Sequence, residues 1–179
     1  MRLFAFFIEI LPLVSFFLVY EWAGLMAAAG VSSALGLGLL VFARISERRV
    51  AVFPLFSVGL SLVLTLAAWL LDATVFIKLQ PTIFNGLFAL VLLGGAMRGE
   101  AMMKRFFAAQ FSLTDRTWML LSIRWGCFFT FLAVANELTW RNLDEAAWVQ
   151  VKVFVFAPLS ALFMLAQLPL TLRGRIDPT

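Results

Sequence analysis

Four charged side chains interrupt the long apolar runs of this 179-residue sequence. They are Glu9, Lys78, Arg124 and Lys152. A charge inside a membrane-spanning helix is costly unless it pairs, protonates or reaches the headgroups, so such residues are functional candidates. Glu9 and Arg124 each lie about six residues, or ~9 Å of helical rise, from the same predicted membrane face. If the run that contains Glu9 crosses the membrane, we therefore expect an inner ion pair between Glu9 and Arg124.

A second polar layer is predicted near the opposite face of the membrane. Its expected members are Lys78, Gln80, Asn136, Glu137 and Lys152. Pro81 should kink its helix because proline lacks the backbone N–H, and Thr82 and Asn85 can satisfy freed carbonyls or bridge to a neighbouring helix. The alternative for the basic residues of both layers is that they extend to the headgroups without a partner.

These residues support little catalytic chemistry. The sequence has no histidine and one cysteine, Cys127, so we expect neither a zinc site nor a disulfide framework, and no cofactor. It shows no nucleophile–base set, glycine-rich phosphate loop or metal-ligand spacing. We interpret Glu137, Asp144 and Glu145 as part of a solvated loop rather than as paired catalytic carboxylates. The sequence therefore predicts a protein that is not an enzyme.

The composition places these residues in a membrane protein. Hydrophobic residues make up 63% of the chain, charged residues 13%, and the mean hydropathy is +1.00. A soluble fold of this length has too small an interior to bury so much apolar surface. The net charge of +4 comes from short basic clusters between apolar runs, which indicates a role in topology rather than nucleic-acid binding. Membrane lipids are the expected surroundings.

Six apolar runs of about spanning length follow one another along the chain. They cover residues 3–20, 23–43, 50–71, 75–97, 118–136 and about 148–172. Because the runs are continuous and do not alternate, we predict an all-α transmembrane helix bundle that forms a single integral membrane domain over residues 1–179. Tryptophans near the run ends are typical of an interfacial belt. They are Trp22, Trp69, Trp118, Trp140 and Trp148.

Arginines and lysines set the predicted orientation. They gather at 44–49, at 98–117 and after the last run, so these links and the C-terminus should be cytoplasmic. The first run is just long enough to cross, at ~27 Å, which leaves five or six spanning helices. A cleaved signal peptide is a less favoured alternative, because the run is long for that purpose and contains Glu9.

The link 98–117 predicts a cytoplasmic amphipathic connector. Its apolar residues recur at helical spacing among basic ones, which favours a short helix on the inner leaflet over a solvated loop. They are Met102, Met103, Phe106, Phe107 and Phe111. The following segment "SLTD" predicts a capping box for the fifth helix, with Ser112 as the cap and Asp115 reaching back.

Four ordered segments resemble the bacterial intracellular septation protein A family, also called the YciB inner-membrane-spanning proteins. "FIKLQPTIFNGLFALVLL" is similar to the family's FIKxKPT segment, and "FIEILPLVSFFLVYEWAGLMAAAG" to its N-terminal acidic, proline and Phe-Phe pattern. "RWGCFFTFLAVANE" and "WVQVKVFVFAPL" resemble its Trp-x-x-Phe-Phe…Asn and Trp-Val-x-Phe-Lys-Val-Phe-Gly segments. The resemblance extends over roughly residues 5–170.

The matched polar positions are Glu9, Lys78, Thr82, Asn136 and Lys152. Gln80 stands where the family pattern has a second lysine, which makes the outer layer less basic. The resemblance implies a role in septation and envelope integrity, partners in the division and elongation machinery, five helices and no catalytic residue. We expect a non-enzymatic membrane protein that acts through contacts with these partner proteins. The alternatives are a small transporter or channel component whose buried charges line a path and, less favoured, an enzyme acting on lipids or cell-wall precursors. Homo-oligomerisation stays open.

Overall fold

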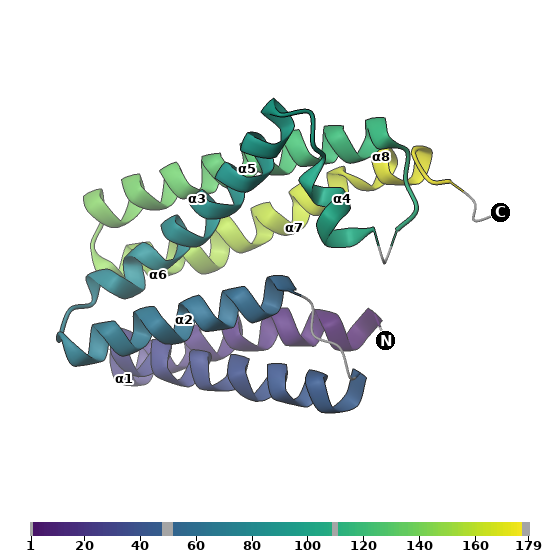
Figure 1. The fold of residues 1–179 in the computed structure, drawn as a ribbon. Helices are drawn as coiled ribbons and strands as arrows, with labels where there is room; N and C mark the ends of the chain where they lie inside the picture. Colours follow the sequence, from purple (N-terminus) through teal and green to yellow (C-terminus); the bar gives the residue numbers. More distant parts are fainter. Residues whose placement is uncertain (1, 48–51, 109–110, 177–179) are drawn as a thin grey trace. The chain divides into compact units, whose positions relative to one another are not determined.

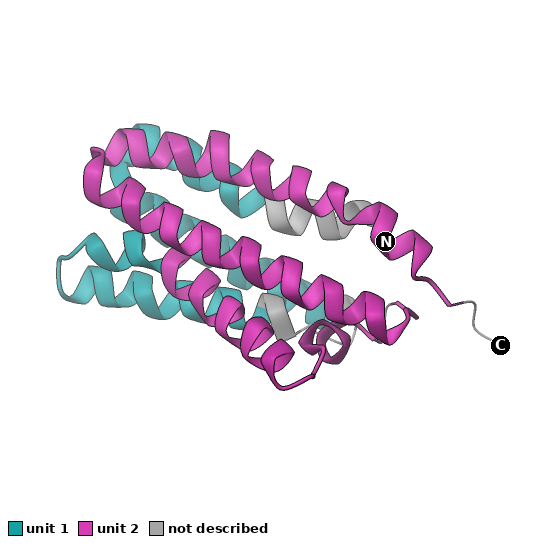
Figure 2. Cartoon of the chain, turned by 90° about the horizontal axis from the view of Figure 1, so that it is seen from above, with its two compact units in different colours: residues 1–80 teal, residues 81–179 magenta. Residues whose placement is uncertain are grey.

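The computed structural model describes residues 2–47, 52–108 and 111–176, with side chains from residue 11 onward except 46–47 and 52–54. These residues are mostly helical, as predicted, and form no extended strand (Figure 1). The chain divides into two compact units, residues 1–80 and 81–179, and the division falls within a helix at Pro81 (Figure 2). Each unit is described by itself.

The first unit contains α1 (Arg2–Glu47) and α2 (Val52–Leu70). α1 folds back on itself at Gly24, whose φ of +77° is a conformation that favours glycine (Figure 1). The Ser32 hydroxyl donates a hydrogen bond to the Pro12 carbonyl over 2.9 Å, whereas a straight helix would separate these residues by ~30 Å. The first two apolar runs therefore form two helical segments joined by a turn.

Polar side chains join α2 to the second half of α1. Ser33 is hydrogen-bonded to Ser61 at 2.7 Å and to Thr65 at 3.1 Å. The Trp69 indole Nε1 donates to the Met26 carbonyl at 3.3 Å. Such bonds help to hold helices together in a bilayer, where lipid tails leave little hydrophobic drive for association.

The second unit consists mainly of two long helices and a third, bent series of helical segments, the rod. α3 (Val75–Met97) has the bounds that the sequence predicts, although its first six residues belong to the first unit. α5 (Asp115–Asn142) runs antiparallel to it. The rod comprises α6 (Glu145–Val151), the π-helical segment η1 (Lys152–Phe156), α7 (Ala157–Ala166) and α8 (Leu168–Arg173).

The predicted outer link at 137–147 is wrong in extent. α5 continues six residues beyond residue 136, and α6 begins at Glu145, so only a short turn separates the two helices. Two polar side chains of these extra turns bond within α5 itself. Arg141 Nε donates to Glu137 Oε2 at 2.7 Å, and Asn142 Nδ2 donates to the Leu138 carbonyl at 2.7 Å.

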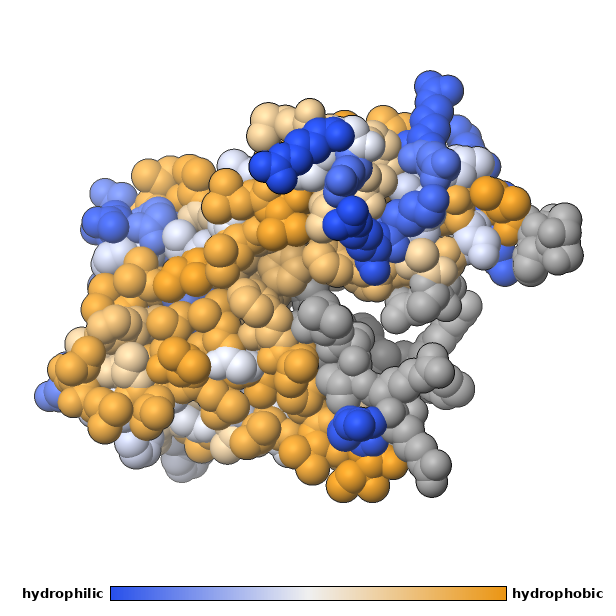
Figure 3. All heavy atoms as spheres, in the orientation of Figure 1, coloured by the Kyte–Doolittle hydropathy of each residue, from blue (hydrophilic) through white to orange (hydrophobic). Residues whose placement is uncertain are grey.

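Four helical stretches in the described residues are long and apolar enough to cross a membrane. They are Leu11–Ile45, Val75–Met97, Asp115–Asn142 and Glu145–Arg173, with Leu55–Leu70 as a shorter apolar helix. The first stretch contains the turn at Gly24, the second run and residues 11–20 of the first run. The number of segments that cross stays a prediction, and much of the exposed surface is apolar (Figure 3).

The connector contains the short helix α4 (Met102–Phe107). Its methionines and Phe106 pack against the core that α3 and α5 share. Its exposed Lys104 forms an ion pair with Asp115 at 2.6 Å. The apolar side of α4 therefore contacts protein, and its position on the inner leaflet stays a prediction.

Thr114 caps α5, because its side-chain oxygen accepts a hydrogen bond from the Thr117 backbone N–H at 3.3 Å. The predicted capping box is wrong. Asp115 is already the first helical residue, and the Ser112 carbonyl accepts the Ile176 N–H at 2.9 Å. The chain near its C-terminal end thereby contacts the segment that leads into α5.

Candidate functional site

The packing of α3 against α5 positions the candidate site in the second unit. The apolar core between these helices consists of Ala89, Leu92, Phe128, Phe129 and Leu132. Gly126 makes room for a leucine of α3, since a methyl group there would lie 2.7 Å from Leu93 Cγ. The antiparallel pairing brings Thr82, at one end of this core, opposite Asn136.

Asn136 joins three helices through its amide. Its Nδ2 donates to Thr82 Oγ1 at 2.8 Å, and its Oδ1 accepts the Trp148 indole N–H at 3.0 Å. Both Asn136 and Trp148 are almost completely buried. Of the two roles that the sequence allows Thr82, the bridge to a neighbouring helix is therefore the one observed.

The prediction that Trp118 and Trp148 belong to a belt at the membrane interface is wrong, because both side chains are buried within the protein. The hydrogen bond between Trp148 and Asn136 was not predicted. A short turn between the two helices would have indicated this bond, because it brings residues near the end of α5 close to residues near the start of α6. The sequence alone did not place that turn, since Asn136 ended the predicted fifth run.

Lys152 lies one turn beyond Trp148, with its Nζ 5.2 Å from the centroid of the Trp148 rings. This geometry is a cation–π contact. Lys152 also begins η1, where the Ala157 N–H bonds to the Lys152 carbonyl five residues earlier. The neighbouring Pro158 has no N–H, which explains a local change in the helical hydrogen-bond pattern. π-helical turns are frequent at functional sites.

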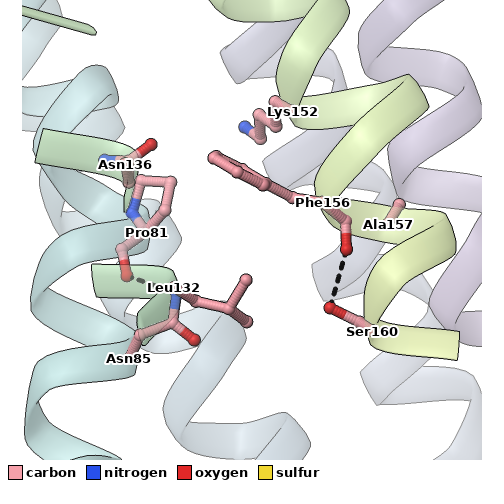
Figure 4. A pocket seen from close by; sticks show the side chains of 8 residues that line it. All are labelled: Pro81, Asn85, Leu132, Asn136, Lys152, Phe156, Ala157 and Ser160. Carbon is pink, nitrogen blue, oxygen red and sulfur yellow. Dashed lines mark hydrogen bonds between the residues drawn. The ribbon is translucent and has the colours of Figure 1, made fainter. Parts of the chain in front are cut away.

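A pocket of about 180 Å³ lies where these elements meet. It is lined by Pro81, Asn85, Leu132, Asn136, Lys152, Phe156, Ala157 and Ser160. Figure 4 shows the side chains of Lys152 and Phe156 directed across it toward Pro81 and Asn136. At ~30 Å³ per water the space corresponds to about six water molecules, less than a typical drug-sized site.

Two polar side chains of the pocket are held by their own helices. Asn85 Nδ2 donates to the Pro81 carbonyl at 2.7 Å, and the Ser160 hydroxyl donates to the Phe156 carbonyl at 2.8 Å (Figure 4). These bonds fix both side chains while leaving the Asn85 carbonyl oxygen and its second N–H for other contacts.

The structure brings together part of the predicted outer layer. Asn136 and Lys152 meet at the pocket, whereas Glu137 pairs with Arg141 on its own helix. Lys78 and Gln80 precede Pro81 on α3, belong to the first unit and are partly buried. Their membership of a single layer with the other residues stays a prediction.

The predicted ion pair between Glu9 and Arg124 cannot be compared with the structure, because only the Arg124 side chain is described. The Glu9 side chain lies outside the described residues. Arg124 has a contact that the sequence reading missed: its Nη1 donates to Gln167 Oε1 at 3.3 Å. Gln167 is largely buried, and its Nε2 donates to the Phe163 carbonyl at 3.2 Å. Gln167 is an uncharged polar residue inside an apolar run, which is the signal that could have indicated it.

Comparison with known proteins covers both units. The family described as intracellular septation protein A matches residues 4–175. The inner membrane-spanning protein YciB of Agrobacterium fabrum (strain C58) is 41% identical over 135 residues, which are 75% of this chain and 66% of that protein. The proteins of the same name from Sinorhizobium medicae and Bradyrhizobium sp. (strain ORS 278) are 39% and 35% identical, over 84% and 95% of this chain and 71% and 85% of their own lengths. No solved structure matches the chain.

Proposed function

This chain belongs to the intracellular septation protein A family, and we propose that it serves cell division and envelope integrity as a non-enzymatic, multi-pass protein of the inner membrane. The match over residues 4–175 is the observation that carries the proposal. The names of its relatives place them in the inner membrane, and apolar helices of spanning length fit the same location.

We further propose that the protein acts through contacts with proteins of the division and elongation machinery. Several polar side chains of the second unit bond to one another, as in Asn136 with Thr82 and Trp148, which fits a role in packing. The rod formed by α6 to α8 presents large apolar side chains outward, including Leu162 and Leu165. In a bilayer such a surface meets lipid tails or the helix of a partner.

A second candidate function is that of a small transporter or channel component. The observation in its favour is the pocket, where Lys152 and Asn136 line a space next to a π-helical turn. Ionisable residues inside membrane spans often mark a solute or ion path. The two candidates differ in whether the charged side chains themselves are needed.

Complementation of a deletion strain tests both candidates. The gene is deleted in its host, and wild type, Glu9→Gln and Lys78→Met are returned at matched protein levels. Cell length, septum placement and survival of osmotic downshift are scored. If the protein acts through its surfaces, both variants rescue the strain. If it carries a solute along a charged path, neither variant rescues while both accumulate normally.

Lys104→Met is the matched control, because it makes the same substitution at an exposed position in the connector. It should rescue under either candidate. The envelope role is wrong if the deletion strain divides with normal length and septum placement and survives downshift like its parent.

A further inference from the structure

We propose that the pocket beside Lys152 binds the phosphate of an anionic ligand, supplied by a phospholipid headgroup or by phosphate in solution. All eight residues that line the pocket belong to the second unit. The inference goes beyond the envelope role and does not depend on it.

The charge of the pocket selects an anion. Among its eight lining residues Lys152 is the only charged one, so the charge that the lining supplies is positive. The lysine ammonium lies against the Trp148 rings and points into the space (Figure 4). An ammonium group is a compact triple donor that suits phosphate oxygens and repels cations.

Two side-chain amides also line the pocket. Asn85 is held at the pocket by its bond to the Pro81 carbonyl and has a second N–H to offer. Asn136 is held from two sides by Thr82 and Trp148. Because these side chains are fixed before a ligand arrives, little conformational entropy is lost on binding.

The depth of the pocket suits a lipid phosphate. Lys152 lies about seven residues, or ~10 Å of helical rise, from the start of α6 at Glu145. Asn136 lies about six residues, or ~9 Å, from the end of α5 at Asn142. In a bilayer whose apolar core is about 30 Å thick, these depths fall near the boundary between headgroups and acyl chains. A volume of about 180 Å³ has room for a phosphate group with a few waters.

Two binding arms distinguish the sources of the phosphate. The full-length protein is purified in a phosphate-free, uncharged detergent. In one arm phosphatidylglycerol is added and the retained lipid is counted by native mass spectrometry. In the other arm inorganic phosphate is titrated and followed by calorimetry. Binding in the first arm alone identifies a headgroup site, and binding in the second alone a site for the dissolved anion.

The variants test the pocket itself. Lys152→Met should weaken binding about tenfold or more, because a charge-assisted hydrogen bond is lost, whereas Lys152→Arg should retain most of it. Ala157→Leu fills the pocket and keeps the lysine, so it should weaken binding as well, and it decides the question if Lys152→Met fails to fold. Lys104→Met is the matched control, because Lys104 is exposed in the connector and does not line the pocket.

The proposal is overturned if the wild-type protein binds in neither arm. It is equally overturned if Lys152→Met and Ala157→Leu, eluting as folded protein, bind like the wild type. In the latter case the lipid or phosphate binds elsewhere on the protein, and the pocket holds only water around the Lys152 ammonium.

Discussion

At the scale of single residues, Asn136 shows how a polar side chain becomes tolerable inside an apolar bundle. It donates to Thr82 and accepts from Trp148, so its cost of burial is offset by bonds to two other helices. Replacement by leucine keeps the branching of the side chain but leaves the Trp148 indole N–H without its acceptor. We expect Asn136→Leu to lower the free energy of unfolding by about 1–2 kcal/mol, measured by denaturant titration in detergent.

The matched control for this prediction is Asn142→Leu, because Asn142 is exposed and bonds only to a carbonyl of its own helix among the described residues. It should change the free energy of unfolding by less than about 0.5 kcal/mol. A double-mutant cycle with Thr82→Val isolates the pair. Additive effects of the two substitutions would show that the hydrogen bond contributes nothing measurable.

At the scale of the helices, the packing of α3 against α5 depends on Gly126. A methyl group at this position would lie 2.7 Å from Leu93 Cγ, closer than van der Waals contact allows. We expect Gly126→Ala to lower the free energy of unfolding by about 1–3 kcal/mol, because overpacking forces the leucine or the helix to move. Gly94→Ala on α3 is the control, since nothing lies near its added methyl group.

Gly94→Ala should instead be neutral or raise the free energy of unfolding by up to about 1 kcal/mol, through better helix propensity. Unfolding curves of the two variants under the same detergent conditions make the comparison. Equal effects at the two positions would mean that propensity, and not the packing of α3 against α5, governs the result.

The same scale shows what the sequence can predict. The bounds of α3 were predictable because polar and turn-forming residues flank a continuous apolar run. α5 exceeds its apolar run because Arg141 and Asn142 find partners one turn back on the same helix, a local satisfaction that hydropathy does not register. Gln167 as the partner of Arg124 depends on how two helices are rotated against each other, which no run length specifies.

At the scale of the whole chain, the distribution of charge predicts which links lie on the cytoplasmic side of the membrane. Basic residues gather at 44–49, 98–117 and after the last run, and acidic ones dominate the other links. The turn at Gly24 makes the first run a helical segment of its own. If that segment crosses, the N-terminus shares the cytoplasmic side with the C-terminus, and six segments span the membrane.

Cysteine labelling decides this count, because Cys127 is the only cysteine and its removal leaves a clean background. In a Cys127→Ala protein we expect Leu3→Cys to react with a membrane-impermeant maleimide only after the cells are permeabilised. Trp22→Cys, at the exposed turn, should react in intact spheroplasts, and Ser112→Cys in the basic connector should not. If Leu3→Cys reacts in intact spheroplasts while these two controls behave as expected, the first segment does not cross. Five segments then span the membrane, and Glu9 no longer lies on the side where it was predicted to meet Arg124.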